Sequence, residues 1–158
     1  MRWLALGTAL TVLVFNLLLE YWLMGLSSAA VIVPGLADFQ PAWNRGVSFS
    51  LFTQTSDGGR YMLMAVLAVI SAAVGLMAWN ATDRLSAPGY GLILGGALGN
   101  LFDRAVYGAV FDFLYLHLGG MPLFICNFAD IAISAGFPLL LAEWLWPRPR
   151  SISGPSRP

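Results

Sequence analysis

Three aspartates in the second half of the chain are the residues best suited to do chemistry: Asp103, Asp112 and Asp130. Asp112 and Asp130 have no basic residue within four positions, and both stand among Val, Phe, Leu, Ala and Ile. Two carboxyl groups held together in an apolar site cannot both ionise, so they share one proton. Such a pair supplies both an acid and a base.

An acid and a base side by side can hydrolyse a peptide bond without a metal or a covalent nucleophile. The carboxylate takes a proton from the attacking water, while the protonated carboxyl donates to the carbonyl oxygen or to the leaving amine. We therefore predict Asp112 and Asp130 as a catalytic pair. The alternative is that each aspartate caps a helix or accepts hydrogen bonds from backbone N–H groups, and spacing alone leaves both interpretations open.

Polar residues around two of these aspartates repeat at helical spacing. Asn100, Asp103 and Arg104 stand at i, i+3 and i+4, so Asn100 shares a helix face with both of the others. Asn127 and Asp130 share a face in the same way. For Asp103 we predict a structural ion pair with Arg104, its neighbour in sequence. Asp103 is therefore expected to support the site and not to react.

The single cysteine and the single histidine form a second candidate pair. Cys126 could act as a nucleophile with His117 as its base, since such partners need not be close in sequence. A lone cysteine among apolar residues is more often a small buried side chain, and His117 alternates with Tyr115 in a strand-like stretch, where we expect an interfacial residue. One histidine and one cysteine leave no ligand cluster for zinc and no internal disulfide. We predict neither a metal nor a cofactor.

The elements that carry these residues are expected to lie in a membrane. Of the 158 residues, 58% are hydrophobic and 10% are charged, which is more apolar than an ordinary soluble domain. With a net charge of zero and no lysine, the chain offers no basic surface for nucleic acid.

Four segments approach the length of about 20 apolar residues that a spanning helix needs, and we place them at residues 3–26, 61–79, 85–105 and 122–146. In the third, Gly91, Gly95 and Gly99 recur every fourth residue and predict a face for close helix packing.

Arginines near the ends of these spans predict the orientation of the chain. Five fall on one side of the membrane and three on the other: Arg2, Arg84, Arg148, Arg150 and Arg157 against Arg45, Arg60 and Arg104. Positive charge is retained on the cytoplasmic side, so both termini are predicted to face the cytoplasm and the polar cluster to lie near the outer surface. Residues 1–147 are expected to form the integral membrane domain, and residues 148–158 a disordered cytoplasmic tail.

Four short blocks, taken together, resemble the signature blocks of the bacterial lipoprotein signal peptidases, or signal peptidase II. The blocks are WNRGVSFSLF with Asn44, Gly46 and Phe49, GGALGNLFDR with Asn100, Asp103 and Arg104, GAVFDF with Asp112, and CNFADIAIS with Asn127 and Asp130. Each block is short, but the order and spacing match within a chain of the expected length. The chain is therefore identified as a divergent member of that family.

The resemblance implies a fold, a substrate and a set of residue roles. The fold is an all-α membrane protein of four transmembrane helices with a small extracytoplasmic β-rich cap. The substrate is a diacylglyceryl-modified prolipoprotein in the bacterial cytoplasmic (inner) membrane, cut before its lipidated cysteine, with membrane lipid as the other partner. Asp112 and Asp130 would be the catalytic residues. The residues that bind substrate or support the site would be Asn44, Gly46, Asn100, Asp103, Arg104 and Asn127.

One motif departs from the family. Its first helix usually carries an Asp and, four residues later, a Lys, and the aligned positions here are Asn16 and Glu20. Glu20 stands beside an aromatic pair, Tyr21 and Trp22, and we expect it to reach interfacial water. The altered motif motivates one alternative, a non-catalytic lipoprotein-binding or scaffold protein of the same fold, although an inert relative has no reason to keep both aspartates. A small transporter is disfavoured because the polar residues gather at one face and do not line a path through the bilayer.

Overall fold

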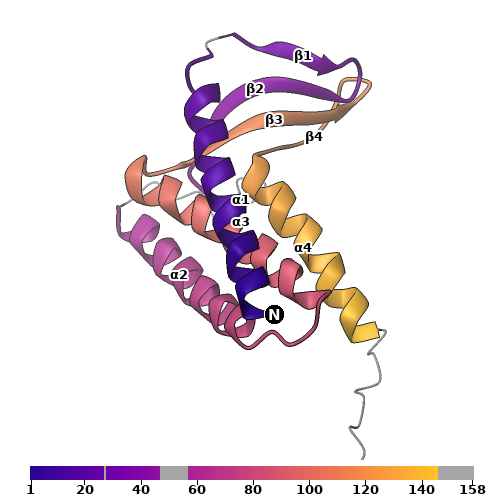
Figure 1. Ribbon diagram of the computed structural model, residues 1–158. Coiled ribbons are helices and arrows are strands. Elements are labelled where there is room, and N and C mark those ends of the chain that lie inside the picture. The colour runs from indigo at the N-terminus through magenta and orange to yellow at the C-terminus, as the bar shows by residue number, and fades with distance from the viewer. Residues whose placement is uncertain (27, 47–56, 146–158) are drawn as a thin grey trace, which may run out of the picture.

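The structure, a computed structural model, describes residues 1–26, 28–46 and 57–145. In chain order the elements are α1 (Arg2–Leu23), β1 (Ala30–Val33), β2 (Ala37–Asn44), α2 (Asp57–Trp79), α3 (Ser86–Val106), β3 (Val110–Leu118), β4 (Met121–Cys126) and α4 (Phe128–Leu145). Figure 1 shows the helices gathered together, with the strands across the end where α1 finishes and α4 begins. The predicted arrangement of helices with a small β-rich cap is present. Phe49 and the predicted tail, residues 148–158, lie outside the described residues.

The first two helices differ slightly from their predicted ranges. α1 ends at Leu23, three residues earlier than expected. α2 begins at Asp57, four residues before the predicted start at Tyr61. An acidic side chain in the first turn is favoured by the helix dipole. Asp57 also lies 3.6 Å from the Arg60 guanidinium one turn later, so the polar residues before the apolar run are part of the helix.

The start of α4 is a correction to the predicted span of residues 122–146. Residues 121–126 form strand β4, which pairs with β3, and the helix begins only at Phe128. Asn127 sets this start because its Oδ1 accepts the backbone N–H of Asp130 at 2.9 Å. This is the contact of an N-cap residue. An apolar run does not by itself show where a strand stops and a helix starts, and the cap does.

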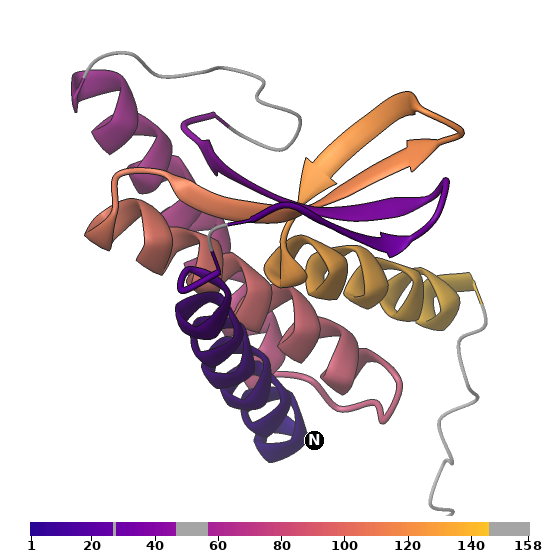
Figure 2. The same cartoon turned by 90° about the horizontal axis from the view of Figure 1, so that it is seen from above.

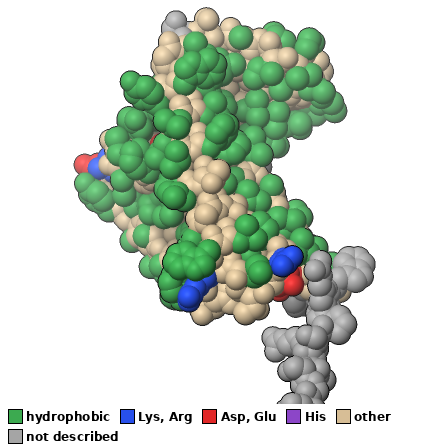
Figure 3. Space-filling model, in the orientation of Figure 1, with side chains coloured by type: hydrophobic (Ala, Val, Ile, Leu, Met, Phe, Trp, Pro, Cys, Tyr) green, Lys and Arg blue, Asp and Glu red, His purple; other side chains and the backbone are tan. Residues whose placement is uncertain are grey.

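Two of the described helices, α1 and α2, are long and apolar enough to cross a membrane, against the four spans predicted. Most of their large hydrophobic side chains are exposed. In Figure 3 hydrophobic side chains extend along the helices, and the charged side chains in view lie near the ends of the bundle. An exposed apolar surface of this extent indicates contact with lipid or with another protein. α3 is less apolar because glycines and a polar cluster occupy much of it.

Gly91, Gly95 and Gly99 of α3 lie where this helix meets α1. A Cβ atom on Gly91 would lie 2.5 Å from the carbonyl oxygen of Ala5, and one on Gly95 would lie 2.6 Å from the carbonyl oxygen of Ala9. Gly99 continues the same face one turn further on. Real side chains do not fit at such distances, so the predicted packing face is confirmed. This close approach brings the polar end of α3 against α1.

The sheet is antiparallel throughout, in the order β1-β2-β3-β4 for the described strands. Figure 2 views it from above and shows the strands crossing the helix ends, with both hairpins extending on the side of α4. Asp112 of β3 lies opposite Ala42 of β2, and Val110 lies opposite Asn44. Asn44 and Asp112 are therefore diagonal neighbours on one face of the sheet. The strand-like stretch predicted around His117 is confirmed as part of β3.

Candidate active site

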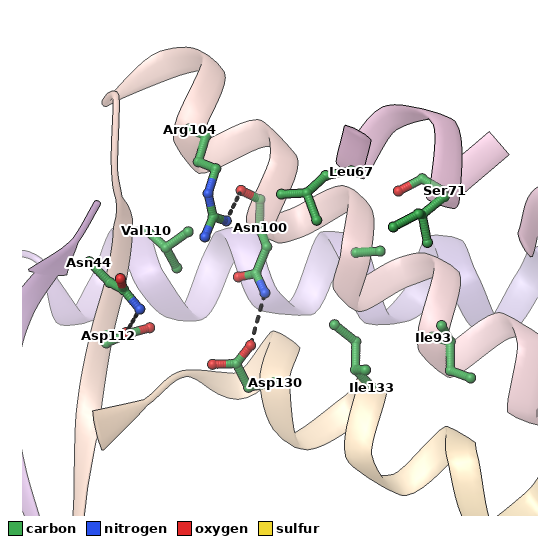
Figure 4. A pocket seen from close by; sticks show the side chains of 12 residues that line it. Asn44, Leu67, Ser71, Ile93, Asn100, Arg104, Val110, Asp112, Asp130 and Ile133 are labelled. Carbon is green, nitrogen blue, oxygen red and sulfur yellow. Dashed lines mark hydrogen bonds between the residues drawn. The ribbon is translucent and has the colours of Figure 1, made fainter. Parts of the chain in front are cut away.

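Asp112 and Asp130 line one cavity, at the place where β3 passes the ends of α3 and α4 (Figure 4). The cavity has a volume of about 170 Å³, and Asn44, Asn100 and Arg104 add to its polar lining. Its other walls are mostly apolar side chains from α2, α3 and α4. A single water needs on the order of 10 to 15 Å³. The cavity therefore has room for a water molecule and a peptide group beside the two carboxyls.

Asp112 is almost fully buried on β3, with 2% of its surface exposed. Its Oδ2 accepts a hydrogen bond from the Asn44 side-chain amide at 2.9 Å. Its Oδ1 is buried and accepts no hydrogen bond from the described residues. Burial raises the pKa of the Asp112 carboxyl to about 7, with the Asn44 hydrogen bond opposing the shift and the charge of Asp130 adding to it. The protonated form is therefore well populated near neutral pH.

Asp130 lies in the first turn of α4, in a closed ring of three hydrogen bonds. The Asn100 side-chain amide donates to Asp130 Oδ1, the Asn127 side-chain amide donates to Asn100 Oδ1, and the Asp130 backbone N–H donates to Asn127 Oδ1, each at 2.9 Å. Asn127 is fully buried, whereas Asp130 is only partly buried. The ring fixes the carboxyl between α3 and α4. No side chain of the described residues donates to its second oxygen, Oδ2.

Arg104 connects α3 to the segment that follows β2. It is buried, and its guanidinium donates to the backbone carbonyl oxygens of Asn100, at 3.0 Å, and of Gly46. The Gly46 backbone N–H in turn donates to Asn44 Oδ1 at 2.9 Å. Arg104 therefore holds the turn that orients Asn44, and Asn44 binds Asp112. The contacts of Arg104 and Gly46 are those of positioning residues.

The predicted ion pair between Asp103 and Arg104 is wrong. The two side chains form no ion pair within 4 Å in the part of the chain that the structure describes. Consecutive residues on a helix do not face the same way, and Arg104 turns to the cavity while Asp103 turns to β3 and α1. Asp103 Oδ2 accepts the Phe111 backbone N–H at 3.0 Å. Asp103 thus anchors the residue directly before Asp112.

Glu20 does not reach interfacial water, which corrects a further prediction. Only 1% of its surface is exposed, and Asn16, one turn before it, is fully buried. The neighbouring Tyr21 is 80% exposed, because the next residue of a helix lies about 100° around the axis. Glu20 faces α3 and lines a separate cavity with Asp103. The altered residues of the first helix are therefore buried in the contact between α1 and α3.

Cys126 and His117 do not form a nucleophilic pair. The register of β3 and β4 places Cys126 opposite Leu114, three residues from His117, which is about 10 Å along the strand. His117 is buried, with its Nε2 at 3.2 Å from Asp38 Oδ2. Burial raises the pKa of the Cys126 thiol to about 11, so its reactive thiolate form is scarce at neutral pH.

Ser71 of α2 is a cavity residue that the sequence did not reveal. Its side chain is 4% exposed and lines the same cavity as the two aspartates (Figure 4). Its hydroxyl forms no hydrogen bond with the described residues. Serine is common in apolar helices, where it usually bonds to the backbone one turn earlier, so its type and position carry no signal.

The fold resembles that of solved membrane enzymes. Two structures, each described as a bacterial membrane enzyme, match this chain with a TM-score of 0.77 and 20% sequence identity. They cover 89% and 91% of this chain, and the matches span 87% and 94% of their own chains. At this identity the likeness establishes the fold alone.

Sequence comparison identifies the family. Residues 8–146 match the family model described as signal peptidase (SPase) II. The lipoprotein signal peptidase of Methylorubrum extorquens (strain PA1) is 50% identical over 119 residues, which are 74% of this chain and 68% of that one. The lipoprotein signal peptidase of Solibacter usitatus (strain Ellin6076) is 36% identical over 94% of this chain and 94% of its own. That of Aquifex aeolicus (strain VF5) is 35% identical over 93% of this chain and 89% of its own. The chain belongs to the signal peptidase II family, a family of peptidases.

Proposed function

We propose that this chain is a membrane-embedded aspartic endopeptidase that removes the signal peptide from diacylglyceryl-modified prolipoproteins, cutting before the lipidated cysteine. The observation that carries the proposal is a single cavity lined by Asp112 and Asp130, two carboxyls with different hydrogen-bond partners. Membership of the signal peptidase II family supports the substrate class.

The two carboxyls divide the work of acid and base. Asp112 holds the shared proton, because none of the described residues donates to its Oδ1 and burial raises its pKa to about 7. Asp130 is the base, with Oδ1 held by Asn100 and Oδ2 available to a water molecule. As the water attacks the scissile carbonyl carbon, Asp130 takes its proton and Asp112 donates to the carbonyl oxygen. This produces a neutral tetrahedral diol.

Breakdown of the diol restores both carboxyls. Asp112 takes back a proton from one diol hydroxyl as the carbonyl forms again, and Asp130 donates its proton to the amide nitrogen as the C–N bond breaks. The products are a free carboxylic acid and a free amine. The carboxyls are held in place throughout by the side chains of Asn44, Asn100, Asn127 and Arg104. Gly46 supplies the carbonyl oxygen that Arg104 binds.

The proposal includes a membrane arrangement for residues 1–147. All four helices cross the inner membrane, both termini face the cytoplasm, and the sheet lies on the outer side. Arg2 supports this orientation. Its guanidinium stacks on Trp79, 5.0 Å from the ring centroid, at the bundle end opposite the sheet. A positive charge at that end favours the cytoplasmic side for it. The acyl chains of the substrate then remain in lipid beside the apolar helices, while the scissile bond reaches the cavity under the sheet.

The test is expression in bacterial cells that lack their own lipoprotein signal peptidase, with prolipoprotein followed on a gel. We expect the wild type to convert precursor to mature form, and Asp112→Asn and Asp130→Asn to leave it uncut while the protein stays folded. Asp57→Asn is the matched control, because that carboxyl is exposed and does not line the cavity. Unprocessed precursor with the wild type, or normal processing by both site variants, contradicts the proposal. Binding of precursor without product would indicate the non-catalytic scaffold.

A further inference from the structure

A second pair of carboxyl groups is buried between α1 and α3. Glu20 and Asp103 are each only 1% exposed. Their side chains line the same cavity, about 170 Å³ in volume, and the two carboxyls are within hydrogen-bonding reach of each other. Neither residue lines the cavity that holds Asp112 and Asp130. The proposed reaction therefore leaves this pair without a direct part in the chemistry.

The two carboxyls of this pair can hydrogen-bond to each other only if the pair carries a proton. Three of its four oxygens, both of Glu20 and Oδ1 of Asp103, are buried and have no hydrogen-bond partner among the described residues. The fourth, Asp103 Oδ2, accepts the Phe111 backbone N–H. Two carboxylates offer no donor to each other, and two adjacent buried negative charges are strongly unfavourable. One proton removes one of the charges and provides the missing donor.

The surroundings place this proton on Glu20. Asp103 accepts a backbone N–H and stands beside Arg104, and both neighbours favour its carboxylate form. Glu20 also has a neighbour that favours its carboxylate, the Asn16 side-chain amide one turn earlier on α1, but this neighbour carries no positive charge. The charged or titratable groups that face the pair from the packed elements are Arg104 and Tyr107 at the end of α3, Asp112 on β3 and Tyr21 on α1.

We propose that Glu20 is a neutral carboxylic acid that donates a hydrogen bond to Asp103 Oδ1, and that the pair positions Asp112. Asp103 links Glu20 to Asp112 because its other oxygen, Oδ2, accepts a hydrogen bond from the backbone N–H of Phe111. Phe111 is the residue directly before Asp112 on β3. Glu20 is thus a positioning residue. Its protonation is independent of the activity, whereas its effect on Asp112 rests on the proposed peptidase function.

Infrared spectroscopy tests the protonation without any turnover. The protein is placed in lipid nanodiscs as the double variant Asp112→Asn, Asp130→Asn, so that the other carboxyl pair cannot contribute. We expect a carbonyl band of a protonated carboxylic acid at neutral pH, and its loss when Glu20→Gln is added. Absence of the band, or a band that Glu20→Gln leaves unchanged, overturns the proposal.

Cleavage kinetics with otherwise wild-type protein test the positioning. Glu20→Gln keeps a neutral donor of the same shape, and we expect its kcat to stay within about twofold of wild type. Glu20→Ala leaves Asp103 Oδ1 without a donor, and we expect kcat to fall about tenfold with little change in KM. Leu18→Ala, at a side chain of α1 that is 64% exposed, is the control and should behave as wild type.

The pattern of rescue separates positioning from mere folding. Thermal unfolding is recorded for each variant, and kcat is compared at a temperature where all of them are folded. If Glu20→Gln loses as much kcat as Glu20→Ala, or if Glu20→Ala keeps full activity, the positioning role is wrong. If the wild type cleaves nothing, the proposed function fails, while the infrared result still decides the protonation.

Discussion

Asn100 donates a hydrogen bond to Asp130 Oδ1 at 2.9 Å, across 30 residues of sequence. The donor is on α3 and the acceptor is in the first turn of α4, so the contact aligns two helices as well as one carboxyl. Asn127 completes the arrangement by donating to Asn100 and capping α4. Each amide uses its oxygen and its nitrogen at once, which fixes the direction of all three hydrogen bonds.

Loss of the Asn100 side-chain amide should impair turnover of the substrate more than its binding. In Asn100→Ala, Asp130 loses a charge-assisted hydrogen bond and the Asn127 amide loses its acceptor, so the carboxyl is no longer held towards the cavity. We expect kcat to fall by about tenfold to a hundredfold with a smaller change in KM. Steady-state cleavage of a lipidated peptide by purified protein measures both. Asn80→Ala is the control, since its exposed amide donates, among the described residues, to the Leu76 carbonyl oxygen and does not line the cavity. Full activity of Asn100→Ala contradicts the prediction.

The pH dependence of cleavage should report on Asp112. With its pKa raised to about 7, the shared proton is lost as the pH rises through neutrality, and activity declines on the alkaline side. Asn44→Ala removes the hydrogen bond that favours the carboxylate, so the pKa of Asp112 should rise further. The alkaline limb of the profile of kcat/KM against pH should then move to higher pH. A limb that moves to lower pH, or stays in place, would show that Asp112 does not hold the proton.

Close packing between α1 and α3 predicts a difference between two glycines. A Cβ on Gly95 would lie 2.6 Å from the Ala9 carbonyl oxygen, whereas one on Gly7 would meet nothing within 4 Å. We expect Gly95→Ala to lower the free energy of unfolding by about 1 to 3 kcal/mol, because α1 must move away. Gly7→Ala should leave it unchanged or raise it by up to about 1 kcal/mol, since alanine favours the helix. Thermal unfolding in detergent measures both, and equal effects would contradict the packing.

Cys126 should be dispensable for cleavage. The thiol is buried, its pKa is raised to about 11, and the strand register keeps it from His117. We expect Cys126→Ala to retain kcat within about twofold, and thiol reagents to leave the wild type active. Loss of cleavage by a folded Cys126→Ala protein would instead support a cysteine nucleophile. His117→Ala, tested in parallel, shows whether the two residues act together.

Local patterns in the sequence were sufficient for much of the fold. The four helices follow from long apolar runs, and the contact of α3 with α1 follows from Gly91, Gly95 and Gly99 at four-residue spacing. The start of α4 was misplaced because residues 121–126 are as apolar as a span. Their pairing with β3, which an apolar run does not encode, makes them a strand. The four motif blocks were specific enough to indicate the family.

By itself, then, the sequence determined which residues lie on which helix face, and that Asp112 and Asp130 are carboxyls in apolar surroundings. Only the tertiary structure decided what each carboxyl meets. Asp103 binds the Phe111 N–H and faces Glu20, although its neighbour in sequence is Arg104. The physical reason is that helical periodicity specifies the direction of a side chain relative to its own axis. The group at the other end of a hydrogen bond comes from another element, and only packing brings the two together.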